Sequence, residues 1–354
     1  ICTAEGYQGS LVGAADQAGG MVMVWQDQRE TQLRIFAQRV DGAGHVLWTT
    51  DGVLLSVNQC FNPYICADGT GGAFITWNDR SDSRGSIYVQ HLDASGAKVW
   101  ASAGIEIANG TTASENTLPV CTHDGAGGVI VAWSQEVDPP SGDLQVVAQR
   151  LSAAGTLLWT SQGRLVGSDI DAGEEISIAA DEDVHGVFLG WVSSAGTGIV
   201  QRVNAGGNPQ WNSTSGYSLG AVVAGSRVRV AERERASGGC FALFKWHHSG
   251  TGIYDFNVLQ VAARDSSTTL AWTEDLDSGG GLSGYPDLGD DYRVTTGGDG
   301  GCGCVWDKVD DGAGDGVFAA LLEYNGDYRG EGVLQVSSGT DGNHFPDATV
   351  WPGY

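Results

Sequence analysis

Short apolar runs, many of them alternating with polar residues, recur along the whole chain, and clusters of glycine, asparagine, aspartate and serine separate them. Side chains of a strand point alternately to its two faces, so such runs predict β-strands, and the clusters are typical of tight turns. One repeat of the pattern holds four runs of strand length, which read PYICA, AFITW, IYVQHL and GIEIA between residues 63 and 108. Four strands joined by short turns predict an antiparallel meander.

A tryptophan at the end of the second strand marks each copy of the repeat. Three copies are clear, and they read DQAGGMVMVW (16–25), DGTGGAFITW (68–77) and DGAGGVIVAW (124–133). Weaker copies follow, so that six tryptophans lie 52, 56, 58, 55 and 60 residues apart. We expect these to be structural residues that pack between neighbouring sheets: Trp25, Trp77, Trp133, Trp191, Trp246 and Trp306.

A second signature follows the first in four repeats, as AQRVDGAGHVLW (37–48), VQHLDASGAKVW (89–100), AQRLSAAGTLLW (148–159) and VQRVNAGGNPQW (200–211). One four-stranded sheet cannot bury both of its faces, so such repeats must stack, and packing around an axis is the usual solution. The predicted fold class is therefore all-β, a β-propeller with six four-stranded blades or, alternatively, seven. Residues 1–354 would form a single domain, with blades at roughly 5–57, 58–109, 110–167, 168–220, 221–280 and 281–340.

The two ends of the chain do not complete a neat ring of six repeats. Aligned with the repeat, residues 1–4 are the last strand of a preceding copy, and residues 344–350 (HFPDATV) are the first strand of a following one. Three arrangements stay open: a seventh blade that both ends build (1–4 and 341–354), a terminal strand that pairs with another molecule, or a chain cut from a longer array.

The pattern DGxGGxxxxWxDxR, followed by IYxQR and GxxxW, resembles the propeller-type repeats of large secreted bacterial proteins of unassigned activity. The first three repeats carry it best, for example in WQDQR (25–29) and IYVQ (87–90). Later repeats depart from it, because the Gln-Arg pair becomes Gln260-Val261 and then Leu322-Glu323. The resemblance implies a secreted protein of the extracellular space or cell surface with a scaffold or adhesive role, and it implies no particular ligand or reaction.

The charge of the chain argues against two classes of binding partner. The formal net charge is −25, from 18 basic and 43 acidic residues, so nucleic acids and anionic membrane surfaces would be repelled. No run of 18 apolar residues is present, so we expect no membrane insertion. Aspartate accounts for 30 of the acidic residues, a composition that suits divalent cations or plain solubility.

Seven cysteines lack the paired CxxC spacing of a zinc site, and the odd number leaves at least one thiol free or paired between chains. Cys60 with Cys66 could staple a strand end in an oxidising compartment. Cys302 and Cys304 are two positions apart on one strand face, a poor geometry for a disulfide between them.

The glycine-rich turn before each tryptophan suggests two kinds of functional loop, and neither fits. A phosphate-binding loop needs a helix after it, whereas residues 73–77 continue as a strand. The Asp box of sialidase-like propellers places its aspartate five residues before the tryptophan, and here the spacing is nine. We therefore interpret the turn as structural, with Asp68 capping the loop amides.

The most charged strand opens the fifth repeat and reads RVRVAERER (227–235). Alternate residues of this strand would face the central channel, so Arg227, Arg229 and Glu232 are the candidate ligand-binding residues. A sialidase-type site would need three arginines around a carboxylate and a Tyr–Glu pair. Salt bridges along a wet channel explain one charged strand more simply, and no catalytic residue is assigned.

Metal sites are the other candidates. The aspartate-rich sixth repeat could offer calcium its oxygen ligands through Asp307, Asp310, Asp311 and Asp315, although the EF-hand spacing is absent. The adjacent His247 and His248 would point to opposite faces of a strand, so they could not both bind one metal unless the loop bends.

These patterns together predict an extracellular binding or structural propeller module, adhesin-like or part of an assembly scaffold, and not an enzyme. Two alternatives stay open: a subunit of a head-to-tail filament formed by terminal strand exchange, and a carbohydrate-active enzyme on the same frame. The expected partners are a carbohydrate, another extracellular protein or further copies in a homo-oligomer. The one cofactor considered is calcium.

Overall fold

The computed structural model describes the chain except residues 57, 82–84, 111–113, 138–141, 174, 224–225, 234–238, 250–254, 265–269, 281–286, 297–300, 310–315, 324, 330–332 and 339–354. It describes only the backbone at 114, 246–249, 255–264, 270–272, 277–280, 287–291, 307–309, 316, 335 and 337–338. The one helix of the described part is a 3-10 turn at Ser213–Ser215, far too short to cross a membrane.

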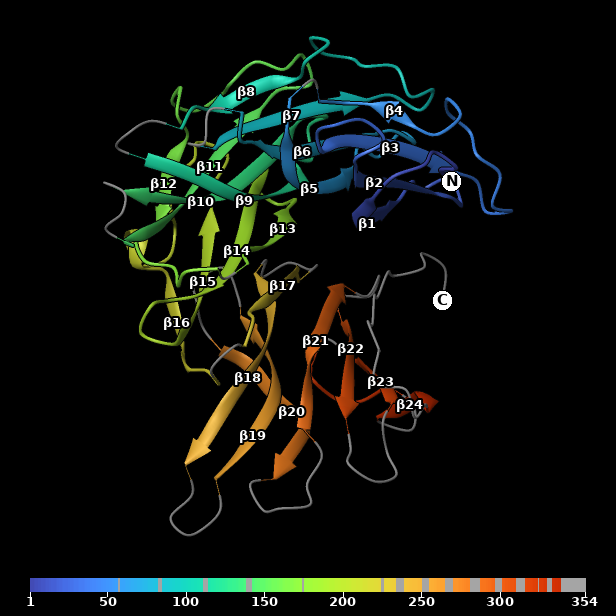
Figure 1. Ribbon diagram of the computed structural model, residues 1–354. Helices are drawn as coiled ribbons and strands as arrows, with labels where there is room; N and C mark the ends of the chain where they lie inside the picture. The colour runs from blue at the N-terminus through green and yellow to red at the C-terminus, as the bar shows by residue number, and fades with distance from the viewer. Residues whose placement is uncertain are drawn as a thin grey trace. The chain divides into compact units, whose positions relative to one another are not determined.

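The described residues form six four-stranded sheets (Figure 1). The first two sheets contain β1 (Gln8–Ala15), β2 (Met21–Asp27), β3 (Arg34–Val40), β4 (Val53–Leu54), β5 (Cys60–Ala67), β6 (Ala73–Asp79), β7 (Ser86–Leu92) and β8 (Ile105–Ala108). The next two contain β9 (Ser114–His123), β10 (Val129–Val137), β11 (Leu144–Leu151), β12 (Arg164–Gly167), β13 (Ser177–Asp181), β14 (Gly186–Val192), β15 (Thr197–Val203) and β16 (Tyr217–Ala221). The last two contain β17 (Arg229–Glu232), β18 (Cys240–Ser249), β19 (Asp255–Arg264), β20 (Leu270–Gly280), β21 (Asp287–Thr296), β22 (Cys302–Val309), β23 (Gly316–Leu322) and β24 (Leu334–Ser338). Strands that follow one another in the chain are neighbours in each sheet, so every sheet is a meander.

The sheets belong to two compact units of the chain. The first compact unit comprises Ile1–Ala172, Val184–Val187 and Val203–Pro209, and it holds β1–β12. The second comprises Gly173–Asp183, Phe188–Arg202 and Gln210–Tyr354, and it holds β17–β24. The sheet β13–β16 has residues in both.

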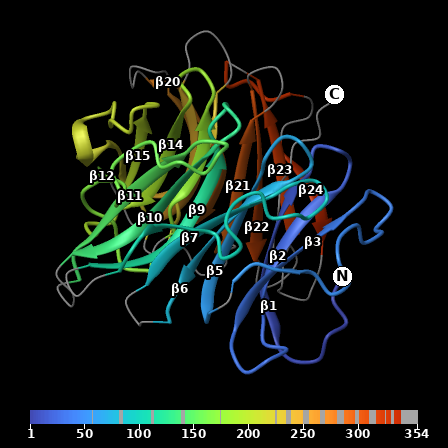
Figure 2. The same cartoon turned by 90° about the horizontal axis from the view of Figure 1, so that it is seen from above.

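The first strands of consecutive sheets lie side by side. In the first compact unit β5 contacts β1 and β9 (Figure 2). In the second, β17 contacts β13 and β21. Meanders that meet through their first strands are the blades of a β-propeller, so the predicted fold class is confirmed. The number of blades in a closed ring stays a prediction, because the sheets fall into two separate compact units.

The tryptophans that mark the repeat are buried. Those at 25, 77, 133, 191 and 306 each expose 3% of their surface or less. Trp77 belongs to a core cluster with Ile75 of its own sheet and with Val24 and Ile35 of the sheet before it, so the cluster spans two sheets. The side chain of Trp246 lies outside the described residues.

An aspartate closes the glycine-rich turn before Trp25, Trp77 and Trp133. Asp68 Oδ1 accepts hydrogen bonds from the backbone N–H of Thr70 at 2.7 Å and of Gly72 at 2.9 Å, and Oδ2 lies 2.9 Å from His91 Nε2. The corresponding pairs in other repeats are Asp16–Arg39, Asp124–Arg150 and Asp181–Arg202. The turn is therefore structural, and it ties the end of the first strand to the third strand.

The tryptophan of the second signature joins one repeat to the next. Its indole N–H donates to a backbone carbonyl of the following repeat, at 2.9 to 3.0 Å, in the pairs Trp48–Ala94, Trp100–Ala153 and Trp159–Ala205. Arg39 and Arg150, nine residues before Trp48 and Trp159, donate from Nη1 to the same carbonyls, so this spacing has a structural cause.

Residues 1–4 do not form the strand that the repeat alignment predicts. Thr3 instead donates from its backbone N–H and its hydroxyl to Asp51 Oδ1, at 2.6 and 3.0 Å. A fourth strand needs a third strand to pair with, and each third strand in the described part of the chain already has its own partner. The other predicted terminal strand, 341–354, lies outside the described residues.

Candidate functional site

Two arginines of the second compact unit lie within 4 Å of one carboxylate, and the charge of a third acts on it. Arg229 begins β17, Arg227 precedes it by two positions, and Arg293 lies on the neighbouring first strand β21. Glu175, just before β13, has its Oε2 atom 3.0 Å from Arg229 Nη2 and 3.8 Å from Arg227 Nε, and the charge of Arg293 also acts on it. We call Arg227, Arg229 and Arg293 the arginine cluster.

The electrostatics of the cluster favour an ionised carboxylate. Burial alone would raise the pKa of Glu175, but the charges of Arg229, Arg227 and Arg293 and the hydrogen bond from Arg229 bring it below its ordinary value. The two partners differ in access to water, because the Glu175 side chain is 48% exposed and that of Arg229 is 11% exposed. Arg229 is thus the nearly buried cation of the cluster, while Arg227 is 31% exposed and Glu175 about half-exposed.

Two buried polar atoms at or near the cluster in sequence lack a partner among the described residues, and one of them belongs to the cluster. One is Nε of Arg229 and the other is Oγ of Ser226, which directly precedes Arg227. An unpaired buried donor costs free energy that a bound acceptor would recover. The cluster therefore has hydrogen-bonding capacity that Glu175 does not use.

Neighbouring strands hold the backbone of the cluster in place. The hydroxyl of Tyr292, on β21, accepts from the backbone N–H of Arg227 at 2.7 Å and donates to the carbonyl of the same residue. Burial raises the pKa of Tyr292 to about 12, so the hydroxyl keeps the proton that it donates. From β13, Ser177 Oγ accepts from the N–H of Val230 at 3.0 Å. These bonds tie β17 and the residues before it to both neighbouring first strands.

Glu232, the third residue predicted from the charged strand, has other partners. Its Oε1 atom accepts a hydrogen bond from the backbone N–H of Glu182 at 2.8 Å. Burial, together with the charges of Glu182, Asp181 and Asp183, raises the pKa of Glu232 to about 7 against the opposing hydrogen bond. The structure thus brings Arg227 and Arg229 together and places Glu232 in an acidic environment of its own.

Sequence reasoning missed Glu175 and Arg293. Glu175 lies 54 positions from Arg229, in the repeat before it, and nothing in its local sequence marks it. Arg293 had a signal, because the segment YRVTT (292–296) places an arginine on the first strand of the repeat after β17.

The predicted metal ligands are not tested by the structure. The side chain of Asp307, the residues Asp310, Asp311 and Asp315, and the side chains of His247 and His248 lie outside the described residues. Within the described part, no group of three histidine, cysteine or acidic side chains is arranged to hold a metal ion. Calcium binding therefore stays a prediction.

The cysteines are free thiols, and the staple considered between Cys60 and Cys66 is wrong. The two lie six positions apart on the same strand, β5, and an extended strand separates such residues by roughly 20 Å. Cys60 is buried beside Trp77, whereas the thiol of Cys66 neighbours that of Cys121.

No family model and no curated protein matches this sequence. Among solved structures, a mutant of AofleA from Arthrobotrys oligospora is similar, with a TM-score of 0.51 and 11% identity over 93% of this chain and 87% of that one. A fungal lectin from Aleuria aurantia, described as a six-bladed β-propeller with a novel fucose recognition mode, has a TM-score of 0.46 and 11% identity over 94% of this chain and 96% of its own. The Hadza microbial sialidase Hz136 has a TM-score of 0.48 and 12% identity over 85% of this chain, which spans 63% of the sialidase. At these identities, the AofleA likeness supports the propeller fold alone.

Proposed function

We propose that the chain is an extracellular binding module that captures a carboxylate-bearing ligand, with acidic glycans as the ligand class to test first. The observation that carries the proposal is the arginine cluster around Glu175. The chain has 43 acidic and only 18 basic residues, so three arginines that act on one carboxylate are an unusual local excess of positive charge. Guanidinium groups pair with carboxylates through parallel N–H···O bonds, which gives direction as well as strength.

Glu175 would pair with the arginine cluster in the unliganded chain, and the ligand would displace it. Its carboxylate is 48% exposed and can move into water at little cost, whereas Arg229 stays nearly buried and needs an anion. An incoming carboxylate would take over the bond to Arg229 Nη2. It would also offer Arg229 Nε an acceptor, which Glu175 does not provide.

The resemblance of the repeat implies an extracellular role, and acidic glycans are abundant carboxylate polymers outside cells. This supports a glycan as the molecule that carries the carboxylate. Lectins and sialidases occur among the similar solved structures, but the support for a carboxylate comes from the cluster itself. An adhesin-like role follows if the glycan belongs to a cell surface. The filament alternative concerns residues 344–354, which lie outside the described residues.

Binding of matched acidic and neutral glycans tests the proposal. The probes are sialyllactose against lactose and galacturonic acid oligomers against galactose oligomers, titrated calorimetrically into the full chain. We expect an acidic probe to bind and its neutral counterpart not to bind. The Arg229→Met variant should bind the acidic probe at least about tenfold more weakly, since it loses a charged hydrogen bond.

The control variant is Arg80→Met, which removes an arginine that pairs with Glu115 at 3.0 Å in the first compact unit. We expect it to bind the acidic probe as the unaltered chain does. Equal binding of acidic and neutral probes, or unchanged binding by Arg229→Met, would overturn the proposal.

One observation favours a second function, a carbohydrate-active enzyme. A pKa of about 7 leaves a large share of Glu232 protonated at neutral pH, which is the state that a general acid needs. If the chain is an enzyme, Glu232→Gln should abolish release of reducing sugar from a bound acidic glycan and leave the affinity for it intact. Binding without any product release by the unaltered chain would exclude this function for that glycan.

A further inference from the structure

The second and third sheets of the first compact unit hold two thiols next to each other. Cys66 lies on β5 and Cys121 on β9, and these first strands are in contact. Phe74, on β6, is the residue paired with Cys66 across the antiparallel ladder. The Sγ atom of Cys121 is 3.7 Å from the carbonyl oxygen of Phe74, so this thiol lies close to the backbone of the residue that pairs with Cys66. Cys121 is a buried member of a core cluster against which Cys66 packs, and its thiol is among the groups that raise the pKa of Cys66.

The surroundings favour this pair over the other cysteines. Cys66 and Cys121 border the same core cluster, whereas Cys60 belongs to the cluster one sheet earlier. Cys302 and Cys304 are also neighbours, but they lie two positions apart on one strand, where the backbone keeps their Cα atoms roughly 6 to 7 Å apart and on parallel vectors. Only the first pair joins two different sheets.

We propose that Cys66 and Cys121 form a disulfide when the folded protein meets an oxidising pool of small disulfides, and that this bond covalently joins the second and third sheets. Such a pool is the condition under which protein disulfides form and persist outside the cytosol. The bond closes a loop one repeat long, which restricts the unfolded chain and raises the stability of the folded one.

The chemistry takes two exchange steps with an oxidised small thiol such as glutathione disulfide. Burial raises the pKa of Cys66, so its thiolate is scarce at neutral pH and the exchange is run in alkaline buffer. Cys66 is partly exposed and Cys121 is 2% exposed, so the Cys66 thiolate reacts first. It attacks one sulfur of glutathione disulfide, which gives a mixed disulfide on Cys66 and releases one glutathione thiolate. Cys121, as thiolate, then attacks the Cys66 sulfur and releases the second glutathione. The protein loses two protons and two electrons, and glutathione disulfide is reduced to two glutathiones.

Peptide mapping of the oxidised folded protein tests the proposal. The full chain is incubated with glutathione disulfide, its remaining thiols are alkylated, and the digest is analysed by mass spectrometry. We expect one crosslinked peptide pair that contains Cys66 and Cys121, five alkylated cysteines, and an unfolding temperature a few degrees above that of the reduced protein.

Two variants and a control separate the steps. Cys121→Ala should stop at the first step and keep glutathione on Cys66, and Cys66→Ala should form neither the mixed disulfide nor the crosslink. Cys304→Ala, a fully buried cysteine of the second compact unit, should form the crosslink as the unaltered chain does. If the Cys121 variant does not fold, the partly exposed Cys66 variant still carries the test. Seven alkylated cysteines after oxidation, or a crosslink between any other pair, would overturn the proposal.

Discussion

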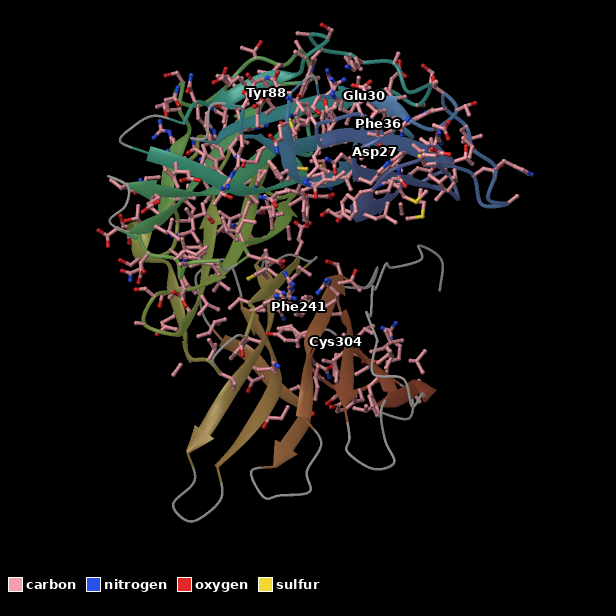
Figure 3. The ribbon with its side chains drawn as sticks, viewed as in Figure 1. Asp27, Glu30, Phe36, Tyr88, Phe241 and Cys304 are labelled. Carbon is pink, nitrogen blue, oxygen red and sulfur yellow. The ribbon has the colours of Figure 1, made fainter. Side chains whose placement is uncertain are left out.

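At the residue scale, Asp27 illustrates how this fold keeps a full charge inside a sheet. Its side chain is 0% exposed and accepts hydrogen bonds from Trp25 Nε1 at 3.0 Å and from Arg29 Nε and Nη2 at 2.9 and 2.7 Å. The guanidinium carbon of Arg29 also lies 3.8 Å from the ring centroid of Phe36. Asp27 and Phe36 are on the neighbouring strands β2 and β3 (Figure 3). Burial opposes ionisation, but the bonds from Arg29 and Trp25 bring the pKa of Asp27 to about 2.

The low pKa of Asp27 makes its charge a source of stability that acid removes. The ordinary value is 3.8, so the charge stabilises the folded state above that pH, and the stabilisation is lost as pH falls towards the folded pKa of about 2. A shift of nearly two pKa units corresponds to roughly 2 kcal/mol. We expect Asp27→Asn to lower the free energy of unfolding by about that amount at pH 7, measured by urea titration of tryptophan fluorescence.

The same titration at pH 3 completes the test of Asp27. Asp27→Asn should lose less stability between pH 7 and pH 3 than the unaltered chain does. Gly44→Ala, which changes no ionisable group, serves as the control and should keep the pH dependence of the unaltered chain. A pH dependence of Asp27→Asn that equals that of the unaltered chain would contradict this account.

At the scale of the element, the turn that leads into the fourth strand is built around the buried tryptophan. Gly52 has φ of +93°, and a Cβ atom there would lie 2.6 Å from Trp25 Cη2 and 3.0 Å from the carbonyl oxygen of Ala37. Equivalent glycines stand against the marker tryptophans of the next two sheets, in the pairs Gly104–Trp77 and Gly163–Trp133. Glycine is required at this turn both for its backbone conformation and for the space that the indole ring takes.

The two requirements can be separated by experiment. Gly44 has a similar φ of +86°, but nothing lies within 4 Å of a Cβ built on it. We expect Gly44→Ala to cost roughly 1 kcal/mol of unfolding free energy, from the backbone strain alone. Gly52→Ala should cost roughly 2 to 4 kcal/mol in the same urea titration, because overpacking against the ring adds to the strain. Equal losses in the two variants would show that the ring does not set the requirement.

The strands and turns could be predicted from the sequence because the residues that determine them lie within each repeat. In DGTGGAFITW the aspartate, the glycines and the alternating run are all local, and the structure turns them into a capped hairpin and a buried Trp77. The candidate site depends instead on Glu175 and Arg293, which reach Arg229 only through the packing of neighbouring first strands. Long-range packing of this kind leaves no spacing in the sequence to detect. The alignment also predicted a strand at residues 1–4, because it compares sequences and takes no account of whether a pairing partner is present.

At the scale of the whole molecule, the arginine cluster opposes the charge of the rest of the chain. The net charge of −25 repels anions at long range, so an anionic ligand would gain its affinity at the cluster and not from the general field. Glu175 neutralises part of the cluster in the unliganded chain. The proposed function therefore requires that Glu175 and the ligand carboxylate compete for the same arginines.

That competition can be measured with one acidic probe and two variants. Calorimetric titration of sialyllactose or a galacturonic acid oligomer into Glu175→Gln should give a dissociation constant about tenfold lower than that of the unaltered chain, because the internal carboxylate no longer occupies the cluster. Arg229→Met should raise the same constant by at least about tenfold. If Glu175→Gln leaves the affinity unchanged or weakens it while Arg229→Met binds normally, the arginine cluster is not a carboxylate-binding site.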